Sequence, residues 1–187
     1  MVIRKAEADE YLRVRDFYYE LIDHIGELEY TSKWKKGIYP EDTYLETSVS
    51  GGDLFLGLEG NRVLAGMIVN TLANDSYAVG KWSIDCEPGE YMVIHILGVM
   101  PSETRKGHAK EMVRFALEYA KKAGMKAVRL DVLKGNRAAE GLYPSVGFVK
   151  ADELQMYYED TGWTDFILYS TAFKKVSFVW YTSEFTI

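Results

Sequence analysis

The chain has 187 residues, of which 48% are hydrophobic and 27% are charged, enough for one domain with its own core. Its formal net charge is −6, and we expect no nucleic-acid or membrane partner, because both require a basic face. Cys86 is the only cysteine, which excludes an internal disulfide and is typical of a reducing compartment. With neither a long apolar span nor a signal-peptide pattern, we expect a single cytoplasmic domain over residues 1–187.

The first part of the chain predicts a short strand, two helices and a β-hairpin. Apolar residues at helical spacing mark the first helix, and a proline opens the second. A Glu-Gly-Asn turn marks the hairpin. The strand and helices are expected at Val2–Lys5, at Ala8–Ile25 with a stop at Gly26, and from Pro40 to Gly51, and the hairpin strands at Leu54–Leu58 and Val63–Asn70.

A polar connection from Thr71 to Glu90 follows, which we expect to be irregular with one short strand at Lys81–Ile84. Two almost wholly apolar segments, Tyr91–Val99 and Ala127–Leu133, predict strands that are buried on both faces. Between them, apolar residues from Ala109 to Ala120 recur at helical spacing and predict an amphipathic helix.

The last part of the chain predicts a short helix and two strands. The helix is expected at Asn136–Tyr143, with Asn136 as its N-cap, and the strands begin at Gly147–Lys150 and Phe166–Tyr169. Residues 172–187 are rich in β-branched and aromatic residues, so we expect an added edge strand there, with a homodimer contact as the alternative. This order of elements predicts an α/β domain with a mixed sheet.

A strand passes into a helix between Ile94 and Leu117 through a proline, two cations and two small residues. Backbone N–H groups are exposed where a helix begins, and they often bind a phosphate. Neither a Walker motif nor the dinucleotide pattern GxGxxG is present.

Residues Thr104 to Ala109, TRKGHA, resemble the pyrophosphate loop of the GNAT superfamily of acyl-CoA-dependent N-acyltransferases, which reads Gln/Arg-x-x-Gly-x-Gly/Ala. Gly107 and Ala109 match its small positions, whereas Thr104 stands where Gln or Arg is usual. The segment Arg129 to Phe148 resembles the later motif of the same family, although Pro144 is unusual there. Its matching residues are Asn136, Ala139, Leu142, Tyr143, Gly147 and Phe148. The segment Met156–Tyr169 resembles the closing strands of some bacterial members, so that the resemblance covers roughly Val2 to Tyr169.

This resemblance implies a mixed, mostly antiparallel sheet that is flanked by helices and splayed between its fourth and fifth strands. Acetyl-CoA would bind with its pyrophosphate on the loop and its pantetheine in the splay, hydrogen-bonded to the main chain like an added strand. Gly98 would ease the close approach of the coenzyme. The positions expected to contact the coenzyme are Leu97, Gly98, Val99, Thr104, Arg105, Lys106, Gly107, His108, Ala109, Lys110, Asn136 and Tyr143.

Acyl transfer to an amine requires a base, because neutralising an ammonium of pKa about 10.4 at pH 7 costs roughly 4–5 kcal/mol. His95 is the first candidate, in the strand before the loop, where alternation places it on one face with Val93, Leu97 and Val99. A lone histidine in an apolar strand is also often a hydrogen-bonded core residue, and both interpretations stay open. Three acidic residues before the strand are rival bases: Asp85, Glu87 and Glu90. The resemblance makes Tyr143 the general acid, with its hydroxyl near the departing sulfur.

The expected function is therefore the transfer of an acetyl group from acetyl-CoA to a small-molecule or peptide amine. A non-catalytic acyl-CoA-binding module is the alternative, to which the departures at Thr104 and Pro144 point. The three histidines show no paired ligand spacing, so we predict no metal site. Five aromatic residues could line an acceptor pocket or belong to the core: Tyr18, Tyr19, Tyr30, Trp34 and Tyr39.

Overall fold

The computed structural model describes residues 1–25 and 32–173, so Gly26, Tyr30 and the tail from residue 174 onward lie outside the described residues. Apart from a short strand expected at Lys81–Ile84, the order of helices and strands is the predicted one. The strands are β1 Val2–Lys5, β2 Leu54–Glu59, β3 Arg62–Asn70, β4 Tyr91–Val99, β5 Ala127–Leu133, β6 Val149–Tyr158 and β7 Gly162–Ala172. The α-helices are α1 Tyr11–Ile25, α2 Asp42–Ser50, α3 His108–Lys122 and α4 Arg137–Leu142.

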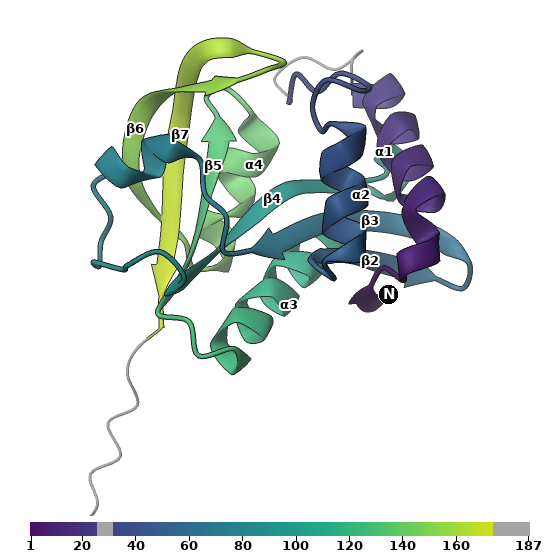
Figure 1. The fold of residues 1–187 in the computed structure, drawn as a ribbon, viewed down its shortest axis with the longest axis horizontal. Helices are drawn as coiled ribbons and strands as arrows, with labels where there is room; N and C mark the ends of the chain where they lie inside the picture. The colour runs from purple at the N-terminus through teal and green to yellow at the C-terminus, as the bar shows by residue number, and fades with distance from the viewer. Residues whose placement is uncertain (26–31, 174–187) are drawn as a thin grey trace, which may run out of the picture.

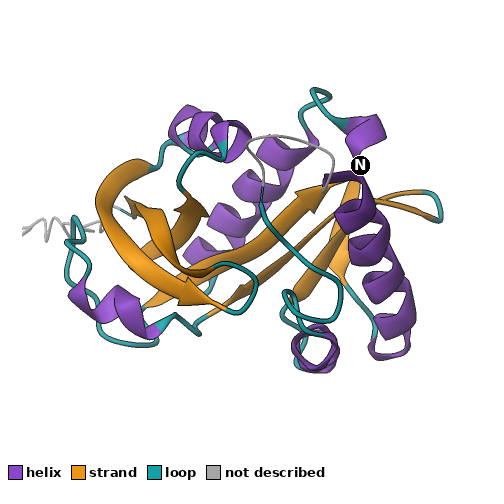
Figure 2. Ribbon diagram, turned by 90° about the horizontal axis from the view of Figure 1, so that it is seen from above, coloured by secondary structure: helices purple, strands orange, loops and turns teal. Residues whose placement is uncertain are grey.

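The strands form one seven-stranded sheet in the order β1-β2-β3-β4-β5-β7-β6. Neighbouring strands are antiparallel except for the pair β4 and β5, which confirms the mixed, mostly antiparallel sheet. Helices cover both faces of the sheet (Figure 2). The α3 residues Met112 and Val113 pack in one core cluster, and the α1 residues Val14 and Phe17 pack in another with Leu45 of α2.

The prediction of a short strand at Lys81–Ile84 is wrong. The connection instead holds a 3-10 turn at Asp75–Val79, which Asn74 caps by accepting a hydrogen bond from the Ser76 N–H at 2.9 Å. The polar groups that follow bond to side chains and turns: the Lys81 N–H donates to the Asp152 carboxylate, and the Trp82 indole donates to the Tyr77 carbonyl. These polar groups therefore find hydrogen-bond partners without pairing to a neighbouring strand.

The predicted splay between the fourth and fifth strands is confirmed. β4 and β5 pair only where Tyr91–Val93 meets Ala127–Arg129, and beyond this point the two strands diverge (Figure 1). The unpaired half of β4 leads directly to the predicted phosphate loop.

A β-bulge in β4 reverses the alternation of its side chains. His95 pairs with Ile68 of β3, whereas Gly98 pairs with Gly66, so β4 contains one residue more than its partner in this interval. Ile96 absorbs the extra residue at φ +44°. The prediction that His95 shares a face with Leu97 and Val99 is therefore wrong, because Ile68 belongs to the α1 side of the core and Leu97 and Val99 pack against the α3 side.

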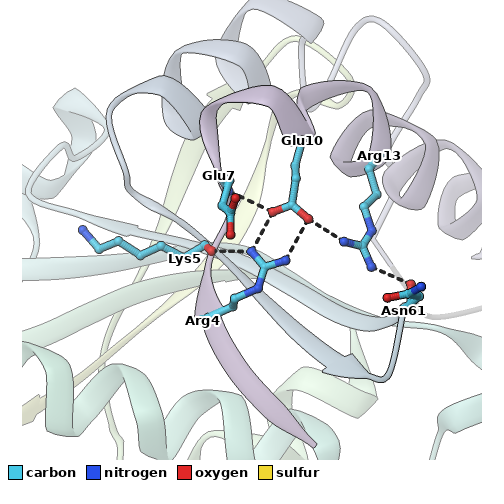
Figure 3. A network of polar contacts seen from close by, with 6 residues as sticks. All are labelled: Arg4, Lys5, Glu7, Glu10, Arg13 and Asn61. Atoms are coloured by element: carbon cyan, nitrogen blue, oxygen red, sulfur yellow. Dashed lines mark hydrogen bonds and ion pairs between the residues drawn. The ribbon is translucent and has the colours of Figure 1, made fainter.

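A polar network joins β1 to the start of α1 (Figure 3). The Glu10 carboxylate accepts two hydrogen bonds from the Arg4 guanidinium, at 2.6 and 2.8 Å, one from the Glu7 N–H at 2.9 Å and one from Arg13. Arg13 also donates to the carbonyl of Asn61 in the turn between β2 and β3. The hydrogen bond from Arg4 is the main cause that lowers the pKa of Glu10 to about 2.

Candidate functional site

The segment between β4 and α3 has the backbone geometry of an anion-binding loop. Arg105 has φ +63° and Gly107 has φ +90°, and α3 begins directly after Gly107. In the part of the chain that the structure describes, the N–H groups from Arg105 to Lys110 donate to no other residue. A Cβ atom at Gly107 would meet no atom within 4 Å, so a ligand can approach this backbone closely.

The buried carboxylate of Glu103 organises the charges of this loop. Its side chain is 7% exposed and accepts hydrogen bonds from Arg62 and Lys106, both at 2.8 Å, while the His108 Nε2 atom lies 3.5 Å away. The hydrogen bond from Lys106 is the main cause that lowers the pKa of Glu103. Lys106 is thus already paired, whereas Arg105 forms no ion pair within the described ranges.

The hydroxyl of Thr104 also has a partner inside the loop. It donates to the carbonyl of Pro101 at 2.9 Å and so closes the 3-10 turn at Pro101–Glu103. This contact is a structural reason for a hydroxyl residue where the resemblance leads one to expect Gln or Arg.

A large cavity of about 740 Å³ lies between the loop, the unpaired half of β4 and α4. Its volume is typical of a site for a small molecule or a cofactor. Among the positions predicted to contact the coenzyme, Lys106 does not line this cavity, and the other predicted positions do. Those lining positions are Leu97, Gly98, Val99, Thr104, Arg105, Gly107, His108, Ala109, Lys110, Asn136 and Tyr143.

Gly98 has a packing role that the sequence analysis did not identify. A Cβ atom at this position would lie 2.3 Å from the Cδ2 atom of Leu21 on α1. Leu21 is 2% exposed, and both residues line the large cavity. The missing side chain of Gly98 therefore lets α1 pack against the splayed half of β4.

An inner cavity of about 110 Å³ adjoins the large cavity and shares Trp34, Leu97 and Tyr143 with it. An outer cavity of about 330 Å³ adjoins the inner one on another side and shares His95, Tyr39 and Tyr158 with it. Two other aromatic candidates of α1 lie elsewhere: Tyr18 is buried in the core, and Tyr19 donates a hydrogen bond to Asp42. The three cavities follow one another, with the inner cavity in the middle.

Tyr143 lies where the large and inner cavities meet. Its ring packs against Phe148 and Tyr169, with centroids 5.6 and 6.1 Å away, and its hydroxyl bonds to no other residue of the described chain. Burial raises the pKa of Tyr143, and the Asp131 carboxylate raises it further. Asn136 is confirmed as the N-cap of α4, with its side-chain oxygen 3.3 Å from the Ala139 N–H.

His95 lines both the inner and the outer cavity. Its Nε2 atom lies 3.1 Å from both the Asn70 Oδ1 atom and the Leu72 carbonyl oxygen. Burial lowers the pKa of His95 to about 4, so the imidazole is neutral at pH 7. His95 is therefore both a hydrogen-bonded residue of the sheet and a lining residue of the two cavities.

The rival bases lie outside the three cavities. Glu90 forms an ion pair with Lys126 at 2.5 Å and accepts a hydrogen bond from the Glu87 N–H. Asp85 is an exposed residue of the same connection. Cys86 packs against a third core cluster, which includes Tyr77 and Leu168, and burial is the main cause that raises the pKa of its thiol.

The sequence analysis missed Asp131, which lines the inner cavity. The hydroxyls of Tyr77 and Tyr158 donate to its Oδ1 atom at 2.7 and 3.0 Å. Burial raises the pKa of Asp131 more than these two hydrogen bonds lower it. The sequence feature that could have identified Asp131 is a carboxylate in the otherwise apolar end of the strand AVRLDVL.

Two kinds of feature are absent from the residues that the structure describes. These residues contain no group of three or more His, Cys, Asp or Glu side chains that could hold a metal ion. None of their helices is both long and apolar enough to cross a membrane.

Comparison with known proteins agrees with this geometry. The family model for the acetyltransferase (GNAT) family matches residues 18–148. Mycothiol acetyltransferase from Renibacterium salmoninarum is 33% identical over 64 residues, which are 34% of this chain and 19% of that protein, so the match spans about a fifth of the relative's length.

Solved structures share the fold. A GNAT-family acetyltransferase from Streptococcus agalactiae superposes with a TM-score of 0.76 at 18% identity, covering 93% of this chain and 96% of its own. The protein yncA from Salmonella typhimurium, solved with its cofactor acetyl-CoA, has a TM-score of 0.64 at 15% identity and covers 94% and 95% of the two chains. With the splayed sheet and a family match over most of its length, this chain belongs to the acetyltransferase (GNAT) family.

Proposed function

We propose that this protein transfers the acetyl group of acetyl-CoA to a primary amine of a small molecule or peptide. The observation that carries the proposal is the continuity of the large and inner cavities at Tyr143. The large cavity has the phosphate loop along one wall, and the inner cavity has titratable side chains, including His95 and Asp131. One side of Tyr143 thus suits a coenzyme and the other suits an acceptor.

The residues of the large cavity fit acetyl-CoA, which supplies an acyl group activated as a thioester. The N–H groups from Arg105 to Lys110 and the N-terminal dipole of α3 would hold its pyrophosphate. The edge of β4 from Leu97 to Val99 has no pairing with β5 and would hold the pantetheine by main-chain hydrogen bonds.

Tyr143 is proposed as the general acid. Its raised pKa keeps the hydroxyl protonated at neutral pH, and its position between the cavities lets it protonate a departing thiolate. His95 is proposed to receive a hydrogen bond from the acceptor amine through Nδ1, since Nε2 already faces two oxygen atoms. A pKa of about 4 makes His95 a weak base, so the proton would not stay on Nδ1 and would pass to solvent water in the outer cavity, which His95 also lines.

Calorimetric titration with acetyl-CoA tests the coenzyme site, with Gly107→Glu as the variant and Gly89→Glu as its matched control. Both glycines are exposed, have φ near +90°, and offer open space to a side chain, but only Gly107 lines the large cavity. A carboxylate at 107 repels phosphate, so we expect at least about a tenfold loss of affinity, about 1.4 kcal/mol, with Gly89→Glu unchanged. Equal binding by the wild type and both variants would contradict the proposed site.

An amine panel then separates catalysis from binding alone. Release of coenzyme A that depends on an added amine supports the transferase. Tight binding of acetyl-CoA without turnover across the panel would instead support the alternative, a non-catalytic acyl-CoA-binding module.

A further inference from the structure

The geometry points to an acceptor that binds in the inner cavity as an alkylammonium ion, with the Asp131 carboxylate as its counter-ion and aromatic rings around it. This inference rests on the proposed function, because it names the class of amine that the acceptor side takes. It follows from the hydrogen bonding of Asp131, the lining of the cavity and the position of the outer cavity.

The two oxygen atoms of the Asp131 carboxylate differ in their side-chain partners. Tyr77 and Tyr158 both donate to Oδ1, and within residues 1–25 and 32–173 no side chain donates to Oδ2 and no cation pairs with the carboxylate. Lys33 also lines the inner cavity, but it is exposed and forms no ion pair with Asp131. Asp131 is half-buried, and a half-buried carboxylate without a counter-charge loses part of its hydration, so a bound ammonium ion would lower that cost.

Aromatic rings line the cavity around this carboxylate. Tyr39, Tyr158 and Phe166 form a continuous row, with ring centroids 5.2 and 5.0 Å apart, and Trp34 lines the cavity too. The faces of such rings attract cations, most strongly where water is excluded. A second acidic residue of the cavity, Asp160, is 9% exposed, and the Lys35 ammonium group donates to its carbonyl oxygen at 3.1 Å.

The outer cavity offers the acceptor a path that does not cross the coenzyme site. It shares Tyr39, His95 and Tyr158 with the inner cavity and has no residue in common with the large cavity. The inner cavity measures about 110 Å³ and the outer one about 330 Å³. We therefore place the ammonium group and its first methylenes in the inner cavity and the bulk of the acceptor in the outer one.

A binding experiment without turnover tests the inference. Butylammonium chloride and its uncharged analogue 1-butanol are titrated into the protein, with and without coenzyme A, and binding is followed by saturation-transfer NMR. The test variant is Asp131→Asn, which removes the charge and keeps an oxygen for the two phenols. Asp165→Asn is the control, because the Asp165 side chain is 49% exposed and lines none of the three cavities.

We expect the wild type and Asp165→Asn to bind butylammonium in preference to 1-butanol, and Asp131→Asn to bind it at least about tenfold more weakly. The inference is overturned if Asp131→Asn binds butylammonium as tightly as the wild type, or if the wild type does not prefer the cation. Acetyl-CoA binding and amine-dependent release of coenzyme A are measured separately. If the wild type binds acetyl-CoA and releases coenzyme A with an amine, but Asp131→Asn keeps the wild-type KM for butylammonium, only the inference fails. If the wild type shows neither binding nor release, the proposed function fails, and the butylammonium titration still tests the inference.

Discussion

The Nε2 atom of His95 lies 3.1 Å from the carbonyl oxygen of Leu72. A carbonyl oxygen can only accept a hydrogen bond, so Nε2 carries the proton and Nδ1 carries the lone pair. The neutral tautomer is therefore held by the backbone, and a second proton would place a charge in a buried site. This is the physical reason that the pKa of His95 falls to about 4.

The buried His95 makes the stability of the protein depend on pH. In the unfolded chain its pKa is 6.5 and in the folded chain about 4, so the unfolded state binds the extra proton first as pH falls. The stabilisation is present above pH 6.5 and is lost as pH falls toward 4, by on the order of 3 kcal/mol. Chemical denaturation of the wild type and of His95→Gln at a series of pH values measures this loss.

Glutamine at position 95 can still donate to Leu72 and Asn70 but does not titrate in this range. The unfolding free energy of His95→Gln should consequently change less than that of the wild type between pH 6.5 and 4. Parallel curves for the two proteins over this interval would show that His95 is not held neutral in the folded state.

Removal of one hydroxyl tests the role of Tyr143. Tyr143→Phe keeps the ring that packs against Phe148 and Tyr169, so coenzyme binding and folding should be retained. Loss of a general acid should lower kcat by about 10²–10⁴-fold. Tyr169→Phe is the matched control, because it makes the same change in the adjacent ring outside the three cavities. Equal kcat values for Tyr143→Phe and the control would exclude the proposed acid.

The network around Glu10 should contribute measurably to stability. Glu10→Gln removes the negative charge that Arg4 and Arg13 share, and hydrogen bonds to charged groups contribute about 1.5–3 kcal/mol each where they are buried. The Glu10 side chain is 13% exposed, so we expect a loss of about 1–2 kcal/mol in unfolding free energy at pH 7. Urea denaturation measures it, and Glu20→Gln is the control.

The Glu20 carboxylate lies on α1, the helix that begins directly after Glu10, and makes no hydrogen bond or ion pair with another described residue. Its removal should change the unfolding free energy by less than about 0.5 kcal/mol. If Glu10→Gln is no less stable than Glu20→Gln, the network in Figure 3 does not stabilise the fold.

Local features could be predicted because their physical causes lie close together in the sequence. Apolar spacing predicted α3, Asn136 was identified as the N-cap of α4, and a glycine turn predicted the hairpin of β2 and β3. The small residues Gly107 and Ala109 marked a loop that lines the large cavity. Each of these features depends on a few neighbouring residues.

Contacts between distant segments decided the rest. The bulge at Ile96 became visible only in the register of β4 against β3, and it moved His95 to the other face. Asp131 accepts hydrogen bonds from the hydroxyls of Tyr77 and Tyr158, which are 54 and 27 residues away in the chain. The order of the elements thus followed from the sequence by itself, because local hydrogen bonding and periodicity determine it. The proposed phosphate loop followed from its resemblance to a family motif. The proposed acceptor side depended on tertiary structure, because its charged and aromatic side chains come together only when the sheet has formed.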